Sequence, residues 1–112
     1  MKENAMYEPS KHIATYHIAG FQHWDGALIL DQLKPGTPLT LAIEPDNPYD
    51  PEAVALFFDS VKLGYIPASE SSLPFLMSYF GHDVFELRVL QIDSQATPWK
   101  QVRVGLYIKD KR

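Results

Sequence analysis

Apolar residues recur at every second position in two separate stretches of the chain, residues 39–43 and 102–108. In the first stretch, Leu39, Leu41 and Ile43 alternate with polar or small residues, and the second stretch repeats the pattern over four apolar positions. A period of two places successive apolar side chains on one face of a β-strand, where a core must cover them. The chain is therefore expected to build a sheet with one apolar face.

Further strands are expected where β-branched and aromatic residues gather between turn residues, at 13–20, 54–58, 61–66 and 84–92. Asp59-Ser60 predicts a tight hairpin between the second and third of these. In the last one, the apolar residues change from odd to even positions after Val89. This change of phase predicts a β-bulge that bends the strand.

Helix is indicated most clearly at residues 73–80, where apolar residues lie at helical spacing: Leu73, Leu76, Met77 and Phe80. Ser71 and Ser72 precede them as N-cap residues and Gly81 follows as a stop signal. Residues 27–33 form a weaker candidate helix. The elements together predict a mainly β fold, a small closed antiparallel barrel of about six strands, OB-like, with one or two short helices.

A chain of 112 residues has room for one domain, since domains average ~100–200 residues. Residues 1–112 are expected to form it, with a core at about 13–108 and flexible ends at 1–12 and 109–112. There is no cysteine, so disulfides and Cys-ligated zinc are excluded. No stretch is apolar for long enough to be a secretion signal or a membrane span, so we expect a cytoplasmic protein without a membrane partner.

The charges are divided unevenly along the chain. The formal net charge is −4, which disfavours non-specific attachment to a nucleic-acid backbone. Residues 1–87 hold 4 basic and 12 acidic side chains, however, whereas residues 88–112 hold 6 basic and 2 acidic ones. A polyanion would be drawn to the surface built by the last quarter, on which Arg103 is expected to point outward.

The loop at residues 44–53 has the most unusual composition, with three prolines between positions 45 and 51. Pro48 restricts the backbone of Asn47, so Asn47, Tyr49 and Asp50 are expected to be displayed with little freedom to lose on binding. A second interpretation is structural, because Asp50-Pro51-Glu52 also suits the first residues of a helical turn. The pattern alone leaves both interpretations open.

The same loop carries a family resemblance. Residues 44–50 read Glu-Pro-Asp-Asn-Pro-Tyr-Asp, Ala-Val follows at 53–54, and Leu-Gly-Tyr-Ile-Pro follows at 63–67. With residues 19–23 and 34–36, this combination resembles the HIRAN domain from about Tyr16 to Ile108. The resemblance implies an OB-like barrel that binds single-stranded DNA and captures its 3′ end.

Carried over by position, the resemblance implies roles for individual residues. Asn47, Tyr49 and Asp50 would form the end-binding pocket, with Tyr49 stacked on a base and Asp50 accepting a hydrogen bond from the terminal hydroxyl. His23 and Trp99 would offer further ring surfaces. Tyr65 either hydrogen-bonds to the DNA strand through its hydroxyl or lies half-buried in the barrel wall, because it is expected to share one face of its strand with Leu63. This chain has Gln22 where the best understood relative has an arginine, and Ala68 where it has a lysine. Each lost cation removes a phosphate contact.

The sequence also allows two functions other than DNA binding. A barrel whose aromatic loop binds a partner protein is the first alternative. The second is a metal-dependent nuclease that uses the carboxylates Asp46, Asp50, Glu52 and Asp59. The histidines show no ligand spacing, and Trp24 is expected in the core or at its rim. We therefore expect a binding module without catalytic residues, metal or cofactor, whose partners are single-stranded DNA and a separate DNA-translocating ATPase or repair protein.

Overall fold

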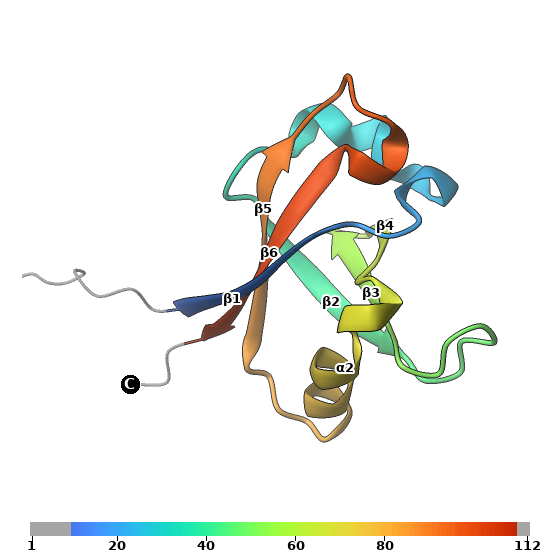
Figure 1. The fold of residues 1–112 in the computed structure, drawn as a ribbon, viewed down its shortest axis with the longest axis vertical. Helices are drawn as coiled ribbons and strands as arrows, with labels where there is room; N and C mark the ends of the chain where they lie inside the picture. The colour runs from blue at the N-terminus through green and yellow to red at the C-terminus, as the bar shows by residue number, and fades with distance from the viewer. Residues whose placement is uncertain (1–9, 110–112) are drawn as a thin grey trace, which may run out of the picture.

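The computed structural model describes residues 10–109 as six strands, one α-helix and four short 3-10 helices (Figure 1). The strands are β1 (Ser10–His17), β2 (Pro38–Glu44), β3 (Ala53–Phe58), β4 (Val61–Tyr65), β5 (Phe85–Ile92) and β6 (Val102–Lys109). The helices are η1 (Phe21–His23), η2 (Asp25–Gln32), η3 (Ala68–Glu70), α2 (Ser72–Tyr79) and η4 (Pro98–Lys100).

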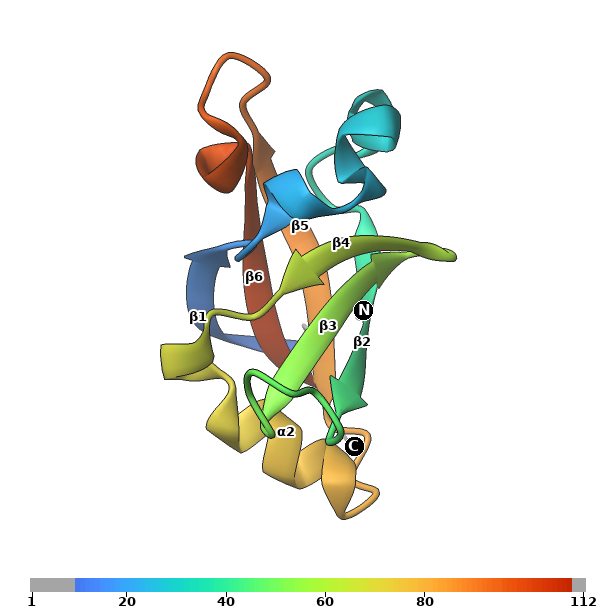
Figure 2. The same ribbon diagram turned by 90° about the vertical axis from the view of Figure 1, so that its right-hand side faces the viewer.

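All six strands belong to one antiparallel sheet with the order β1-β6-β5-β2-β3-β4. The expected mainly β fold with about six strands is thereby confirmed. Figure 2 shows β3 and β4 crossing in front of β5 and β6. The two edges meet at one point, where Ala19 and Tyr65 exchange backbone hydrogen bonds of 2.8 and 2.9 Å. Closure of the barrel along its whole length stays a prediction.

The change of phase in β5 corresponds to a real bulge. The register of β5 against β6 shifts between Val89 and Gln91, so that Leu90 has no partner across the ladder. On β6 the alternation is confirmed for Val102, Val104 and Leu106, which are buried. It was wrong for Ile108, which is 39% exposed because it lies near the end of the strand, at the border of the core.

The core fixes the segment that follows β1. Ile18 and Phe21 are each 1% exposed, and they anchor the chain just before and within η1. A Cβ at Gly26 would lie 2.3 Å from the Phe21 ring, so only glycine lets η2 pack over that ring. The second helix expected at residues 27–33 is the 3-10 helix η2, which ends at Gln32 and has a break at Ile29. This packing sets the position of His23 and Trp24.

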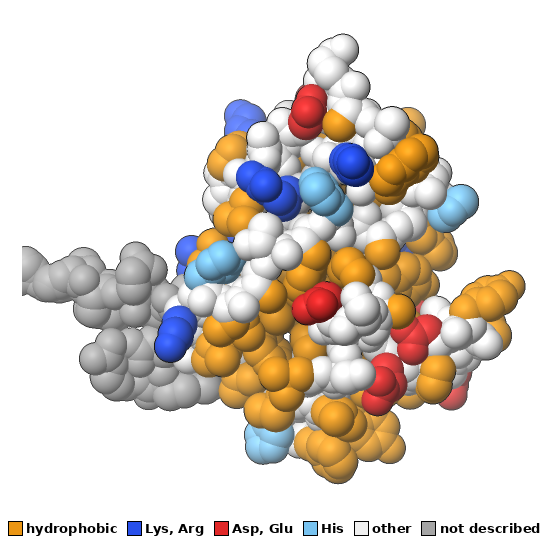
Figure 3. Space-filling view, viewed as in Figure 1, with side chains coloured by type: hydrophobic (Ala, Val, Ile, Leu, Met, Phe, Trp, Pro, Cys, Tyr) orange, Lys and Arg blue, Asp and Glu red, His pale blue; other side chains and the backbone are white. Residues whose placement is uncertain are grey.

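The helix α2 forms where it was expected, but most of the apolar residues whose spacing indicated it are exposed. Leu73, Leu76 and Phe80 are 56%, 44% and 68% exposed, whereas Pro74 and Phe75 are buried. Apolar residues occupy both faces of this helix, so spacing alone does not decide which face meets the core. Figure 3 shows the exposed apolar side chains gathered around α2 at the bottom of the view.

The two ends of α2 differ in how well the sequence predicted them. Ser71 is the N-cap residue as expected, but its hydroxyl makes no capping hydrogen bond to the helix and instead donates to the Ala68 carbonyl at 3.3 Å. The predicted stop was right. Gly81 has φ +81°, and His82 donates to the Met77 carbonyl at 2.8 Å, as in a glycine-terminated helix.

Two expectations concern the chain ends and membranes. The predicted flexible ends fall mostly outside the described residues, but Lys11 and His12 pair with Ile108 and Tyr107 and thus belong to the sheet. Between residues 10 and 109, no helix has the length and apolar character needed to cross a membrane.

Candidate nucleic-acid interface

A groove of about 940 Å³ opens between the 45–50 loop, the end of β4 and η1. In Figure 1 this loop projects from the ends of β2 and β3. The residues lining the groove include Ala19, Gly20, His23, Trp24, Glu44, Asn47, Tyr49, Asp50, Lys62, Tyr65 and Ala68. We call this surface the loop groove.

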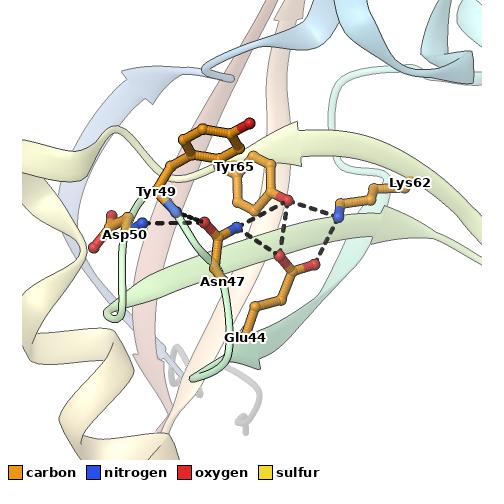
Figure 4. A network of polar contacts seen from close by, with 6 residues as sticks. All are labelled: Glu44, Asn47, Tyr49, Asp50, Lys62 and Tyr65. Carbon is orange, nitrogen blue, oxygen red and sulfur yellow. Dashed lines mark hydrogen bonds and ion pairs between the residues drawn. The ribbon is translucent and has the colours of Figure 1, made fainter.

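Four side chains join across the floor of the loop groove in one polar network (Figure 4). The Lys62 Nζ lies 2.6 Å from Glu44 Oε2 and 2.7 Å from the Tyr65 hydroxyl. That hydroxyl donates to Glu44 Oε1 at 2.8 Å, and Asn47 Nδ2 donates to the same oxygen at 3.0 Å. The network ties β2 and β4 to the first residues of the loop.

The network holds one full negative and one full positive charge. Burial opposes ionisation of Glu44, but hydrogen bonds from Lys62, Asn47 and Tyr65 outweigh it and lower the pKa of Glu44. Burial likewise opposes the charge on Lys62, but the hydrogen bonds to Glu44 and Tyr65 raise the pKa of Lys62. The pair is therefore ionised at neutral pH, and its two charges compensate each other.

A β-bulge explains why Lys62 and Tyr65 lie on the same side of β4. The register against β3 passes from Leu56–Gly64 to Phe57–Lys62, which leaves Leu63 as the extra residue. Leu63 enters the core with no exposed surface, and Gly64 has φ +143°. The expectation that Leu63 and Tyr65 share one face of the strand was wrong, because the bulge changes the alternation between them.

Asn47 fixes the loop from within. Its Oδ1 accepts hydrogen bonds from the backbone N–H groups of Tyr49 and Asp50 at 2.8 and 3.0 Å. Its Nδ2 donates to Glu44 Oε1 in the polar network. Both ends of the amide are thus used inside the protein. Asn47 therefore holds Tyr49 and Asp50 in place.

Asp50 has one carboxylate oxygen in use. Its Oδ1 accepts the N–H of Glu52 at 2.9 Å, which is the capping role that the sequence also allowed. Among residues 10–109, Oδ2 has no hydrogen-bond partner. Tyr49, next in the chain, is 95% exposed. The tip of the loop therefore presents an uncovered ring beside an available acceptor.

Trp24 forms the opposite wall of the groove. It is 39% exposed, its ring meets the Tyr65 ring edge-on at 6.2 Å, and Lys62 Nζ lies 4.0 Å from the centroid of Trp24. The sequence placed Trp24 in the core or at its rim, and the rim is right. Trp24, Glu44 and Lys62 were nevertheless missed as site residues. Gly64 was the available signal, since an isolated glycine in a strand indicates a bulge.

The structure divides the predicted site residues into two groups. Lining the loop groove are His23, Asn47, Tyr49, Asp50 and Tyr65. Outside it lie Gln22, exposed on η1, Trp99, 52% exposed on η4, and Arg103, exposed on β6. For metals, no three His, Asp or Glu side chains of the described part of the chain gather into a possible ligand set.

Two solved structures share this fold. A protein from Lactobacillus plantarum matches with a TM-score of 0.76 and 21% identity, over 90% of this chain and 96% of that one. The HIRAN domain of human HLTF matches with a TM-score of 0.67 and 13% identity, over 92% of this chain and 82% of that one. At such identities the likeness shows the fold alone.

Comparison with sequences gives a more specific result. No curated protein matches this chain. The family model of the HIRAN domain, however, matches residues 13–110, which includes all six strands except the first three residues of β1. The chain therefore belongs to the HIRAN domain family.

Proposed function

We propose that the loop groove binds single-stranded DNA and holds its 3′-hydroxyl end. HIRAN domains are in general DNA-binding modules, which supports nucleic acid as the ligand. The observation that carries the proposal is the pairing of an exposed Tyr49 ring with the unpartnered Oδ2 of Asp50 on a loop that Asn47 holds rigid. A rigid loop loses little conformational entropy when a ligand binds.

Stacking supplies the affinity in this proposal. A base that stacks on an exposed aromatic ring gains ~1–3 kcal/mol, whatever its identity. Tyr49 offers a ring that is 95% exposed, and His23 on η1 also lines the groove. Phosphate attraction contributes little here, because Lys62 is neutralised by Glu44 and position 68 holds an alanine.

The carboxylate supplies the selectivity for an end. An ionised Asp50 repels an internal phosphate but accepts a charge-assisted hydrogen bond from a free hydroxyl. A strand terminus with a 3′-hydroxyl is therefore favoured over the interior of a strand. The negative net charge of the chain fits this role, since selection here depends on repulsion as well as attraction.

The test compares three versions of one short strand by fluorescence anisotropy: a free 3′-hydroxyl, a 3′-phosphate and a 5′-phosphate. The 3′-phosphate places a dianion beside Asp50 and should weaken binding strongly, whereas the 5′-phosphate should change it little. Equal affinity for the two 3′ forms would refute end capture. No binding of any form would refute the groove as a DNA site.

A further inference from the structure

A second hollow, of about 180 Å³, lies between β1, the ends of β5 and β6, and η4. Its lining includes His17, Lys100 and Arg103, the amides of Gln91 and Gln101, and one carboxylate, Asp93. Asp93 accepts the N–H of Gln95 at 3.0 Å, and Gln101 donates to the Ser94 carbonyl at 3.3 Å. We call this surface the basic hollow.

The two Lys and Arg side chains of the basic hollow differ from three other cations of the described chain in forming no ion pair. Lys62, Arg88 and Lys109 each form an ion pair with a carboxylate. Within residues 10–109, Lys100 and Arg103 form none. A concave surface with two available cations and nearby amide donors suits a phosphate group.

The basic hollow adjoins the loop groove. His17 lines the hollow, while Ala19 and Gly20 line the groove. In an extended chain, residues two apart lie within ~7 Å of each other. Ile18, between them, donates to the Val102 carbonyl at 3.1 Å and so holds this segment beside the start of β6. The two surfaces therefore adjoin along residues 17–20.

The surface charges follow the same division. In Figure 3, most Lys, Arg and His side chains lie over the upper and left part of the face shown, whereas most Asp and Glu side chains lie below and to the right, toward the 45–52 loop. The helix η4, which carries Lys100, packs against η1, which carries His23. Trp99, on the same helix, is 52% exposed and offers a ring beside the hollow.

We propose that the basic hollow binds the phosphates of the DNA strand on the 5′ side of the end held in the loop groove. This inference rests on the proposed function of the groove. An OB-type domain covers ~4–16 nucleotides, so a strand longer than the groove continues over neighbouring surface. The groove then selects the end by stacking and hydrogen bonding, and the hollow adds affinity that depends on strand length and salt.

The test compares a strand of ~4 nucleotides with one of ~12, both with a free 3′-hydroxyl. The variant is Lys100→Glu/Arg103→Glu. The matched control is Lys11→Glu/Lys34→Glu, which makes the same change of charge at two exposed lysines outside both surfaces. We expect the wild type and the control to bind the long strand more tightly than the short one. The hollow variant should bind the short strand normally and lose the gain with length.

Salt dependence gives a second readout. Each phosphate contact on a single strand contributes about 0.7 to the slope of log affinity against log salt, so two lost contacts lower the slope by about 1.4. Between 50 and 200 mM salt, the loss of affinity for the long strand should therefore be about sevenfold smaller in the hollow variant than in the wild type. An unchanged slope would overturn the proposal.

A third readout identifies the strand phosphates themselves. A long strand with uncharged methylphosphonate linkages outside its last few nucleotides should bind the wild type as weakly as the natural strand binds the hollow variant. The hollow variant should lose nothing further with it. Additive losses would show that the phosphates are held elsewhere and would overturn the proposal.

Two outcomes separate this proposal from that for the groove. If the short strand binds without preference for a 3′-hydroxyl but the length gain is lost in the hollow variant, the groove proposal fails and the hollow stands as a DNA site. If the length gain survives in that variant, the hollow proposal fails alone. A melting curve verifies folding, and Lys100→Gln/Arg103→Gln replaces the variant if the charge reversal lowers the melting temperature.

Discussion

The ammonium group of Lys62 lies 2.6 Å from a carboxylate oxygen of Glu44 and 4.0 Å from the centroid of the Trp24 ring. One side chain thus connects the floor of the loop groove to its far wall. The side chains of Lys62 and Glu44 are only 18% and 28% exposed, so solvent screens the pair less than it would screen a surface pair. The pair shapes the groove rather than attracting phosphate to it.

Glu44→Gln should lower the free energy of unfolding at pH 7 by about 1–2 kcal/mol, because a charge-assisted bond is replaced by a neutral one. The pKa of Glu44 is lowered in the folded protein, so its contribution is present above the pKa of the unfolded chain, about 4.3, and is lost as the pH falls through the folded value. Urea denaturation of both proteins should therefore converge at low pH. A difference that grows as the pH falls would contradict the assignment.

Tyr49→Ala should weaken binding of a short single strand by about 1–3 kcal/mol, since it removes the exposed stacking surface of the loop. The melting temperature should stay unchanged because the ring, at 95% exposure, packs against almost nothing. Anisotropy and a thermal melt measure the two effects. Tyr79→Ala, an exposed tyrosine on α2, is the control and should leave DNA affinity as it is.

Gly64→Ala should destabilise the fold by about 2–4 kcal/mol. Its φ of +143° is unfavourable for any other residue, and a Cβ there would lie 2.4 Å from the Ala19 carbonyl oxygen. Gly36→Ala is the matched control, because Gly36 also has positive φ, +94°, but open space around it. The Gly36 variant should lose less stability in urea denaturation, and an equal loss would show that the contact with Ala19 does not matter.

The sequence predicted those features that depend on local pattern. Alternation identified β2 and most of β6, a change of phase located the β5 bulge, and Gly81 located the end of α2. These signals are local because a strand or a helix end is determined by a few neighbouring residues. The order of the strands in the sheet depends on contacts between distant segments, which one sequence does not show.

The errors share a physical origin. On α2, Leu76 and Phe75 are equally apolar, and only the packing against η3 and the sheet decides that Phe75 is buried. On β4, a bulge at Leu63 turns Tyr65 toward Lys62.

Asp50→Asn is the sharpest test of the end-binding groove. The two carboxylate oxygens have different surroundings: Oδ1 caps Glu52, and Oδ2 has no partner within the described chain. Asparagine can keep the cap through its own Oδ1, so stability should not move. At the other position it replaces a charged acceptor with an N–H donor.

Replacing an acceptor with a donor changes the affinities for the two forms of the 3′ end in opposite directions. A 3′-hydroxyl strand loses a charge-assisted bond, so its affinity should fall, whereas a 3′-phosphate strand loses a repulsion and gains a donor, so its affinity should rise. The ratio of the affinity for the 3′-hydroxyl strand to that for the 3′-phosphate strand should therefore fall, because both affinities change. Anisotropy with the two strands measures this ratio. If Asp50 only caps the turn, the ratio stays where it was, and the carboxylate has no part in choosing the end.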